Sequence, residues 1–178
     1  MLKITVTGAT GQFGNLVINN LLDRGVQPED IRASVRNPAK AVRHQERGID
    51  VRRGDFDDAE ALQHAFSGTD HVLIISTDRV GGRVEQHRRA VQAARDAGVK
   101  RILYTSVVDM GSGDATHPIA IDHRATEQFI RETGIHYTFL RNSFYAEYML
   151  APVVQAIDDG TFVSSIGEGK LGAVARTD

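Results

Sequence analysis

Short apolar runs alternate with longer amphipathic stretches along this chain, which is typical of parallel strands covered by helices. The apolar runs predict strands at 2–7, 31–35, 49–53, 72–75, 100–105 and 136–140, and a short strand at 162–163. The stretches between them predict helices at 12–23, from 38, at 57–66, from about 83 to 97, at 117–133 and at 153–157. This order predicts a Rossmann-type α/β fold, a doubly wound parallel sheet with helices on both faces and right-handed crossovers. We expect one domain over 1–178.

Three glycines lie directly between the first strand and the first helix, in the stretch KITVTGATGQFG. Gly8 permits a sharp turn, Gly11 permits main-chain N–H groups to approach a phosphate, and Gly14 permits the helix to pack near its strand. The helix N-terminus adds a positive dipole end. The spacing is G-x-x-G-x-x-G rather than the commoner G-x-G-x-x-G, and a glycine-rich turn without a ligand is the alternative. The predicted cofactor-binding residues of this stretch are Gly8, Thr10, Gly11, Gln12, Phe13 and Gly14.

The residue after the second strand bears on which dinucleotide is bound. An acidic residue at this place usually accepts a hydrogen bond from the ribose 2′-OH of NAD, whereas an arginine suits the 2′-phosphate of NADP. Here the position holds Arg36, with Lys40 one helical turn further on, and no acidic residue lies between 31 and 43. We therefore expect NADPH to be preferred over NADH. The alternative is that both are solvated surface charges.

Polar residues follow three further strands, at the edge where ligands bind in open α/β sheets. Asp55 can accept from the adenine amino group, or it can be the N-cap or a first-turn acid of the next helix. Ser76 and Thr77 follow the fourth strand, and Ser106 follows the fifth. We expect these three hydroxyl side chains to line one crevice.

Composition narrows the class of protein. The chain has 178 residues, no cysteine, and 21 Lys plus Arg against 23 Asp plus Glu, a net charge of −2. This balance disfavours nucleic acid and anionic membranes as partners, and the lack of cysteine removes thiolate chemistry. No apolar run approaches the length of a membrane span and no secretory leader is visible, so we expect a cytoplasmic protein. His87, His117 and His136 lack metal-ligand spacing, so no metal site is expected.

Several segments together resemble a known family. They are TGATGQFG, VRNPAK, GDFDD, IIST, QHRRAVQAARDAGVKRILYTS and TFLRNSFY. In this combination the chain resembles the NmrA-like atypical short-chain dehydrogenase/reductases, and among them the type-2 NAD(P)H:quinone oxidoreductases, with triphenylmethane reductase a near relation. The resemblance runs along the whole chain.

The resemblance implies an NADPH-binding Rossmann domain that passes a hydride directly to a quinone or similar conjugated acceptor. It places the 2′-phosphate on Arg36 and the nicotinamide side on Ser76, Thr77 and the 142–145 loop. The substrate-binding residues implied are Asn142, Phe144 and Tyr145, because aromatic rings stack on planar acceptors.

Ordinary short-chain dehydrogenases use a Tyr-x-x-x-Lys pair on the helix after the fifth strand, where the lysine lowers the tyrosine pKa. Here that helix carries His123 and Glu127 instead. Tyr137 and Arg141 have the same spacing but fall on a strand, so we read them as a chance match. Carbonyl chemistry is therefore disfavoured, whereas a quinone can take its proton from solvent. His123 is either the proton donor or a structural histidine, and Ser106 is either polarising or structural.

A second function class fits the same residues. Without a Tyr-x-x-x-Lys pair, the chain can also be a non-catalytic NADP(H)-binding redox sensor of the NmrA type. The family continues past residue 178 with segments that cover the substrate side, so the chain is either partial or a short member with an open site. The sequence names neither the acceptor nor the proton donor, and it leaves the oligomeric state open, a homodimer included.

Overall fold

The computed structural model describes residues 2–79, 81–108, 117–163, 167–168, 170 and 172–178. Its contacts divide the chain into two units, Met1–Arg141 and Asn142–Asp178. The expectation of one domain over 1–178 stays a prediction.

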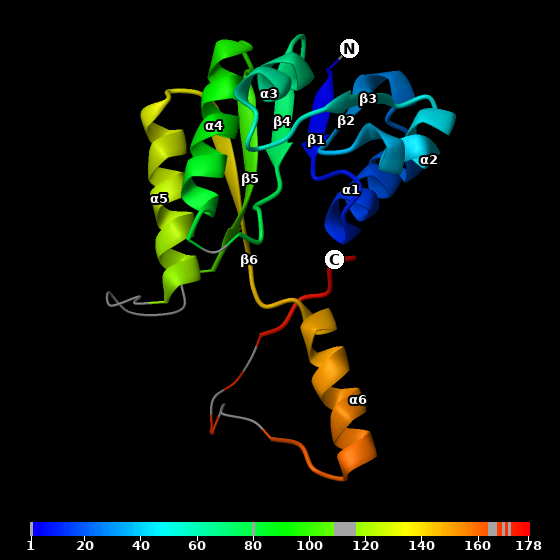
Figure 1. The fold of residues 1–178 in the computed structure, drawn as a ribbon, viewed down its shortest axis with the longest axis vertical. Coiled ribbons are helices and arrows are strands. Elements are labelled where there is room, and N and C mark those ends of the chain that lie inside the picture. The colour runs from blue at the N-terminus through cyan, green and yellow to red at the C-terminus, as the bar shows by residue number, and fades with distance from the viewer. Residues whose placement is uncertain (1, 80, 109–116, 164–166, 169, 171) are drawn as a thin grey trace. The chain divides into compact units, whose positions relative to one another are not determined.

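A six-stranded sheet forms the centre of the first unit (Figure 1). The strands are β1 (Ile4–Thr7), β2 (Ile31–Val35), β3 (Asp50–Arg53), β4 (His71–Ile74), β5 (Arg101–Val107) and β6 (His136–Asn142). Their order is β3-β2-β1-β4-β5-β6, and the pairs β1–β2, β1–β4, β2–β3 and β4–β5 are parallel. The strand order reverses between β1 and β4, so the carboxyl ends of these two strands border the crevice where doubly wound folds bind ligands. The predicted fold class is confirmed.

In the described part of this unit, the helices that connect the strands are α1 (Gln12–Asp23), α2 (Val42–Glu46), α3 (Ala59–Phe66), α4 (Arg83–Asp96) and α5 (Pro118–Glu132). Short 3-10 turns lie at Pro28–Asp30 and Pro38–Ala41. Asn37 begins the second of these turns, since its side chain accepts from the Ala39 N–H at 3.0 Å. Asp58 caps α3 by accepting from the Ala61 N–H at 3.0 Å, which explains why this helix begins at Ala59 rather than at 57 as predicted.

Alternate side chains of the central strands supply two cores, one on each face of the sheet. Val72 and Ile74 of β4 point into the core shared with α3, α4 and α5, whereas Leu73 points into the core shared with α1. Figure 1 shows α3, α4 and α5 on one side of the sheet and α1 and α2 on the other. Both faces are therefore covered, which explains why the central strands read as continuous apolar runs.

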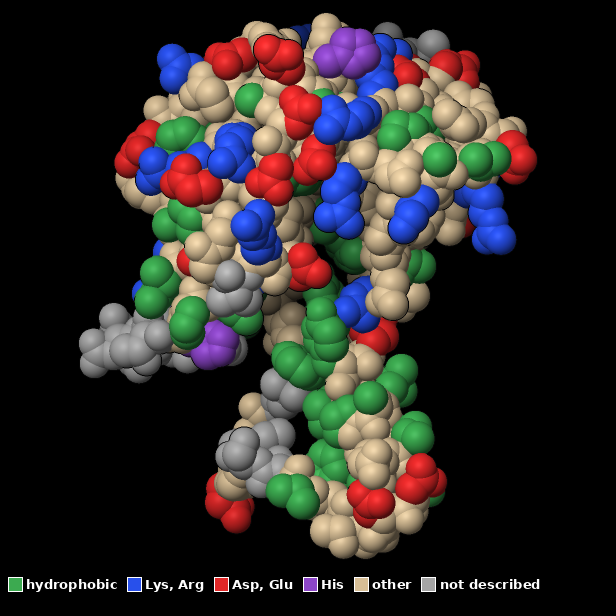
Figure 2. Space-filling model, in the orientation of Figure 1, with side chains coloured by type: hydrophobic (Ala, Val, Ile, Leu, Met, Phe, Trp, Pro, Cys, Tyr) green, Lys and Arg blue, Asp and Glu red, His purple; other side chains and the backbone are tan. Residues whose placement is uncertain are grey.

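The second unit contains a 3-10 turn at Ala146–Met149 and helix α6 (Leu150–Asp159). Its backbone is joined by a parallel bridge between Tyr145 and Val174. The predicted strand at Phe162 and Val163 is wrong: both residues are exposed and neither is in a strand. An apolar pair needs a partner strand, and none lies beside it in the described part of this unit. Hydrophobic side chains follow α6 along its length (Figure 2).

Charge on the first unit is mixed. On the face shown in Figure 2, Lys and Arg side chains are interspersed with Asp and Glu side chains. Within the described residues, no helix is both long enough and apolar enough to cross a membrane.

Candidate functional site

The glycine loop between β1 and α1 lies at the reversal of the strand order. Gly8 has a φ of +59°, a left-handed conformation that glycine adopts without strain. A Cβ on Gly14 would lie 2.4 Å from the Gly8 carbonyl oxygen, so this position has no room for a side chain. The Thr7 hydroxyl accepts from the Ile75 N–H at 2.9 Å, which joins the loop to the end of β4. Two of the three glycines are thus required by geometry.

Helix α1 begins directly after this loop, with Gly11 as its N-cap. No described side chain caps it and its first turn holds no acidic residue. Thr10, Gly11 and Gln12 are exposed. The N-terminus of a twelve-residue helix is therefore open to an anion, and its dipole favours one.

The predicted 2′-phosphate residues follow β2, the strand that pairs with β1. Arg36 and Lys40 are exposed, and in the part of the chain that the structure describes neither forms an ion pair. Asp55 is half-buried, and its Oδ1 accepts from the Asp57 N–H at 3.0 Å. Asp58, not Asp55, caps the helix, so Asp55 stabilises the preceding turn. Its contact with adenine stays a prediction.

Ser76 and Thr77, which follow β4, are held by their backbone. The Ser76 N–H donates to the Thr105 hydroxyl at 2.8 Å, and the Thr77 N–H donates to Nε2 of His87 at 3.0 Å. The Thr77 hydroxyl oxygen is buried and has no hydrogen-bond partner among the described residues. These hydrogen bonds therefore fix the loop that follows β4 in place.

A buried polar network lies beneath that loop, between α4, α5 and β5. His87 Nδ1 lies 3.0 Å from the Thr126 hydroxyl and 3.2 Å from the Tyr104 hydroxyl. His123 Nδ1 lies 2.7 Å from the Tyr104 hydroxyl, and its Nε2 lies 3.2 Å from Nη1 of Arg83. A backbone N–H and a guanidinium can only donate, so Nε2 accepts in both histidines and Nδ1 carries the proton. Both imidazoles are neutral in this arrangement.

Burial explains the titration of the network. It lowers the pKa of His87 to about 3, and the nearby His123 and Arg83 lower this pKa further because a proton on His87 would be repelled by Arg83 and by any proton added to His123. Burial and the charge of Arg83 lower the pKa of His123 to about 4. Burial also raises the pKa of the Tyr104 hydroxyl above its ordinary value. None of the three groups ionises near neutral pH.

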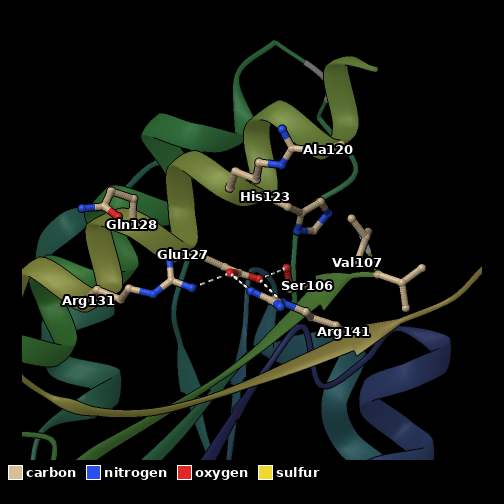
Figure 3. Close-up of a pocket in the computed structure, with 10 residues that line it drawn as sticks. Ser106, Val107, Ala120, His123, Glu127, Gln128, Arg131 and Arg141 are labelled. Carbon is tan, nitrogen blue, oxygen red and sulfur yellow. Dashed lines mark hydrogen bonds and ion pairs between the residues drawn. The ribbon is translucent and has the colours of Figure 1, made fainter. Parts of the chain in front are cut away.

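A pocket of about 360 Å³ opens between the end of β5 and α5 (Figure 3). Its lining residues are Ser106, Val107, Val108, Ala120, His123, Arg124, Glu127, Gln128, Arg131 and Arg141. Figure 3 shows the Glu127 carboxylate between Ser106, Arg131 and Arg141. The Ser106 hydroxyl donates to it at 2.7 Å, and Arg131 donates to it at 2.9 Å. Arg141 binds both carboxylate oxygens, at 3.0 and 2.6 Å.

These bonds determine what Glu127 and Ser106 can do. Burial acts to raise the pKa of Glu127, but the hydrogen bonds from Arg141 and Ser106 outweigh it and hold this pKa below its ordinary value. Glu127 is therefore a charged anchor and not an acid at neutral pH. Because the Ser106 proton is directed at Glu127, its oxygen faces the pocket as an acceptor.

The structure brings together some of the predicted site residues. Ser106 and His123 line one pocket, but Ser76 and Thr77 are not among the residues described as lining it. His87 and Tyr104 were missed by sequence reasoning as parts of the site's support. His87 precedes Val91 by one helical turn on the buried face of α4, a signal that could have revealed its burial.

Asn142, Phe144 and Tyr145 belong to the second unit. The Asn142 side-chain amide donates to the Tyr145 hydroxyl at 2.8 Å, and the Phe144 ring is exposed. The guanidinium of Arg176 lies 4.6 Å from the centre of the Tyr145 ring. Burial raises the pKa of the Tyr145 hydroxyl. Their contact with a substrate stays a prediction.

The residues present suit a dinucleotide and give no sign of a metal centre. A loop without room for a Cβ, an open helix N-terminus and two cations that form no ion pair with a described residue match a diphosphate and an additional phosphate. Across the described residues, no three His, Cys, Asp or Glu side chains lie close enough together to hold a metal ion.

Comparisons with known proteins agree with this geometry. Quinone oxidoreductase 2 of Escherichia coli is 42% identical over 177 residues, which are 98% of this chain and 60% of that protein. Triphenylmethane reductase of Citrobacter sp., solved with NADP(H), is 40% identical with a TM-score of 0.90, over 99% of this chain and 62% of that one. The E. coli NADPH-dependent quinone oxidoreductase QOR2, solved with NADPH, is 41% identical with a TM-score of 0.90, over 98% and 60%.

The chain thus spans about three fifths of the length of these relatives. The family model described as NAD(P)H-binding matches residues 8–174, which include the glycine loop, the Arg36 segment and the pocket. The resemblance to NmrA-like reductases is confirmed, and this chain belongs to the NAD(P)H-binding family.

Proposed function

We propose that this protein is an NADPH-dependent reductase that transfers a hydride to a quinone or a similar conjugated acceptor. The observation that carries the proposal is the glycine loop, where the Gly8 turn and the blocked Cβ position of Gly14 place an open helix N-terminus at the sheet reversal. The similarity to a quinone oxidoreductase and a dye reductase supports the acceptor class.

NADPH is preferred over NADH in this proposal because Arg36 and Lys40 are the cations beside the loop. Arg36 can bind a phosphate with two parallel N–H donors, and Lys40 adds a second charge. Both side chains are exposed, and neither would have to give up an ion pair with a described residue in order to bind the phosphate.

The acceptor end is assigned to the pocket lined by Ser106 and His123. Asn142, Phe144 and Tyr145 belong to the second unit, and their contact with an acceptor stays a separate prediction. When bound, NADPH supplies a hydride. A quinone needs this hydride and one proton to become a hydroquinone. His123 is neutral near pH 7 and its Nδ1 proton faces Tyr104, so we assign the proton to solvent. Ser106 would orient a donor on the cofactor or the substrate through its acceptor oxygen.

NADPH oxidation, followed by absorbance with benzoquinone, menadione and a triphenylmethane dye, tests the proposal. We expect turnover of at least one acceptor, and loss of NADPH affinity in Arg36→Ala by about tenfold with NADH affinity unchanged. Arg24→Ala, an exposed arginine at the other end of α1, is the matched control.

Three outcomes would contradict parts of the proposal. Tight NADPH binding without turnover of any acceptor would favour a redox sensor over a reductase. Equal affinities for NADPH and NADH would remove the role of Arg36. Failure to bind either dinucleotide would remove the proposal as a whole.

A further inference from the structure

We propose that His44 is a positioning residue for the cofactor diphosphate, because it orients the peptide between Ala9 and Thr10 so that the Thr10 N–H faces the ligand. This inference rests on the proposed dinucleotide site and adds a residue to it that lies outside the glycine motif.

His44 is 4% exposed and lies on α2, after the Arg36 segment. Its Nε2 lies 3.1 Å from the Ala9 carbonyl oxygen. A carbonyl can only accept, so Nε2 carries the proton and donates. Nδ1 is buried without a hydrogen-bond partner among the described residues. The contact with Ala9 is thus the single side-chain hydrogen bond described for this imidazole.

The Ala9 carbonyl and the Thr10 N–H belong to one peptide unit. In a trans peptide these two groups point in opposite directions, and the described part of the chain contains no cis peptide bond. Ala9 is fully buried and its carbonyl points to His44, whereas Thr10 is exposed. The Thr10 N–H therefore points outward, and no described group of the protein accepts from it.

Other bonds hold this part of the loop only weakly. The Gly11 N–H donates to the Gly8 carbonyl at 2.9 Å, which closes the turn without involving the Ala9 carbonyl. The Ala9 N–H reaches the Ser34 carbonyl at 3.5 Å, the limit of a hydrogen bond. Without His44 the Ala9 carbonyl would be buried and unpaired, which favours rotation of this peptide and loss of the outward N–H.

Two variants separate this role from simple packing. His44→Leu fills the space without a donor, whereas His44→Gln places an amide N–H near the position of Nε2. Dissociation constants for NADPH and NADH are measured by fluorescence titration of the full chain. We expect His44→Leu to weaken both about tenfold, since the diphosphate is common to both, and His44→Gln to recover most of this loss. Gln45→Leu, an exposed neighbour on the same helix, is the matched control.

A spectroscopic measurement adds a readout that does not depend on affinity. In ¹⁵N-labelled wild-type protein, NADPH should move the Thr10 amide resonance downfield, as expected for an N–H that donates to a phosphate oxygen. His44→Gln should keep this shift.

The inference is overturned if His44→Leu binds both dinucleotides as the wild type does, if His44→Gln is as weak as a folded His44→Leu, or if the Thr10 resonance does not move. If His44→Leu fails to fold, His44→Gln and the wild-type resonance still decide. Wild-type protein that binds neither dinucleotide would instead refute the proposed function. If His44→Leu weakens the binding of NADPH but not of NADH, His44 supports the 2′-phosphate contact of Arg36 and not the diphosphate contact.

Discussion

Acidification tests the neutral state of the buried network around His87 and His123. Burial lowers their pKa values to about 3 and about 4 from an ordinary value of 6.5. Between pH 6.5 and 4 the unfolded chain therefore binds a proton at each histidine, whereas the folded chain does not. Stability is complete above pH 6.5 and falls as the pH decreases, because protons bind preferentially to the unfolded state.

The size of this loss follows from linkage. Each histidine contributes about 1.4 kcal/mol per pH unit below its ordinary pKa, so at pH 5 each costs about 2 kcal/mol and the pair about 4 kcal/mol. A domain is stable by about 5–15 kcal/mol in total, so this loss is a large fraction.

Urea unfolding at pH 8 and at pH 5, for the wild type and two variants, measures the effect. His87→Gln keeps an acceptor for the Thr77 N–H, and His123→Asn keeps a donor for Tyr104, but neither variant titrates. Each variant should be less stable at pH 8, yet its loss between pH 8 and pH 5 should be about 2 kcal/mol smaller than that of the wild type.

His136, whose side chain is exposed, provides the control. Its replacement by Gln removes an imidazole that is not buried, so comparison with this variant separates the effect of burial from the loss of an imidazole as such. If His87→Gln and His123→Asn lose as much stability as the wild type over this range, the histidines are not neutral in the fold and the reasoning is refuted.

Three further variants test other features of the first unit. Gly14→Ala places a methyl group 2.4 Å from the Gly8 carbonyl oxygen, so overpacking of about 1–3 kcal/mol should lower Tm by about 3–10 °C in a thermal scan. Glu127→Gln removes a carboxylate whose pKa is lowered in the folded chain, so the stability it contributes is present at neutral pH and is lost as the pH falls. Urea unfolding of this variant at pH 7 should show a cost of about 1 kcal/mol, which is modest because both arginines are partly solvated. Arg32→Met leaves the buried Ala65 carbonyl and the partly buried Ser67 carbonyl without this donor and leaves Asp50 with Arg52 alone, so urea unfolding should show a cost of about 2–4 kcal/mol.

Each of these variants has a matched control. Gly172→Ala adds a methyl group in open space, and a Tm as low as that of Gly14→Ala would refute the steric account. Glu132→Gln, on the exposed part of the same helix, should be nearly neutral. Arg52→Met removes the more exposed partner of Asp50, and a cost equal to that of Arg32→Met would show that burial is not the cause.

Local features of the sequence predicted the frame of the protein. The limits of α1 and β2 agree with the sequence pattern, because Gly11 and the turn before Ile31 are local signals that mark where these elements begin. The glycine loop was recognisable for the same reason. The short strand at 162–163 was not, because a strand depends on a partner that the local pattern does not contain.

The support of the site depends on contacts between distant residues. His87 and Tyr104 are 17 residues apart, and His44 and Ala9 are 35 residues apart. Their hydrogen bonds follow from how helices pack on the sheet, which no motif encodes. For the same reason the sequence placed Ser106 at the correct strand end but could not show that its proton is directed at Glu127.

The central position of β1 has a consequence for synthesis. The Thr7 hydroxyl accepts its hydrogen bond from the Ile75 N–H, which lies 68 residues later in the chain. At about 5–20 residues per second, a ribosome needs about 3–14 s to extend the chain over that distance. The glycine loop leaves the ribosome before β4 does, so one side of β1 stays without its neighbour until β4 has emerged. A nascent chain therefore cannot complete the dinucleotide site before roughly two fifths of this sequence has been made, and any earlier partner of the open strand edge would compete with β4.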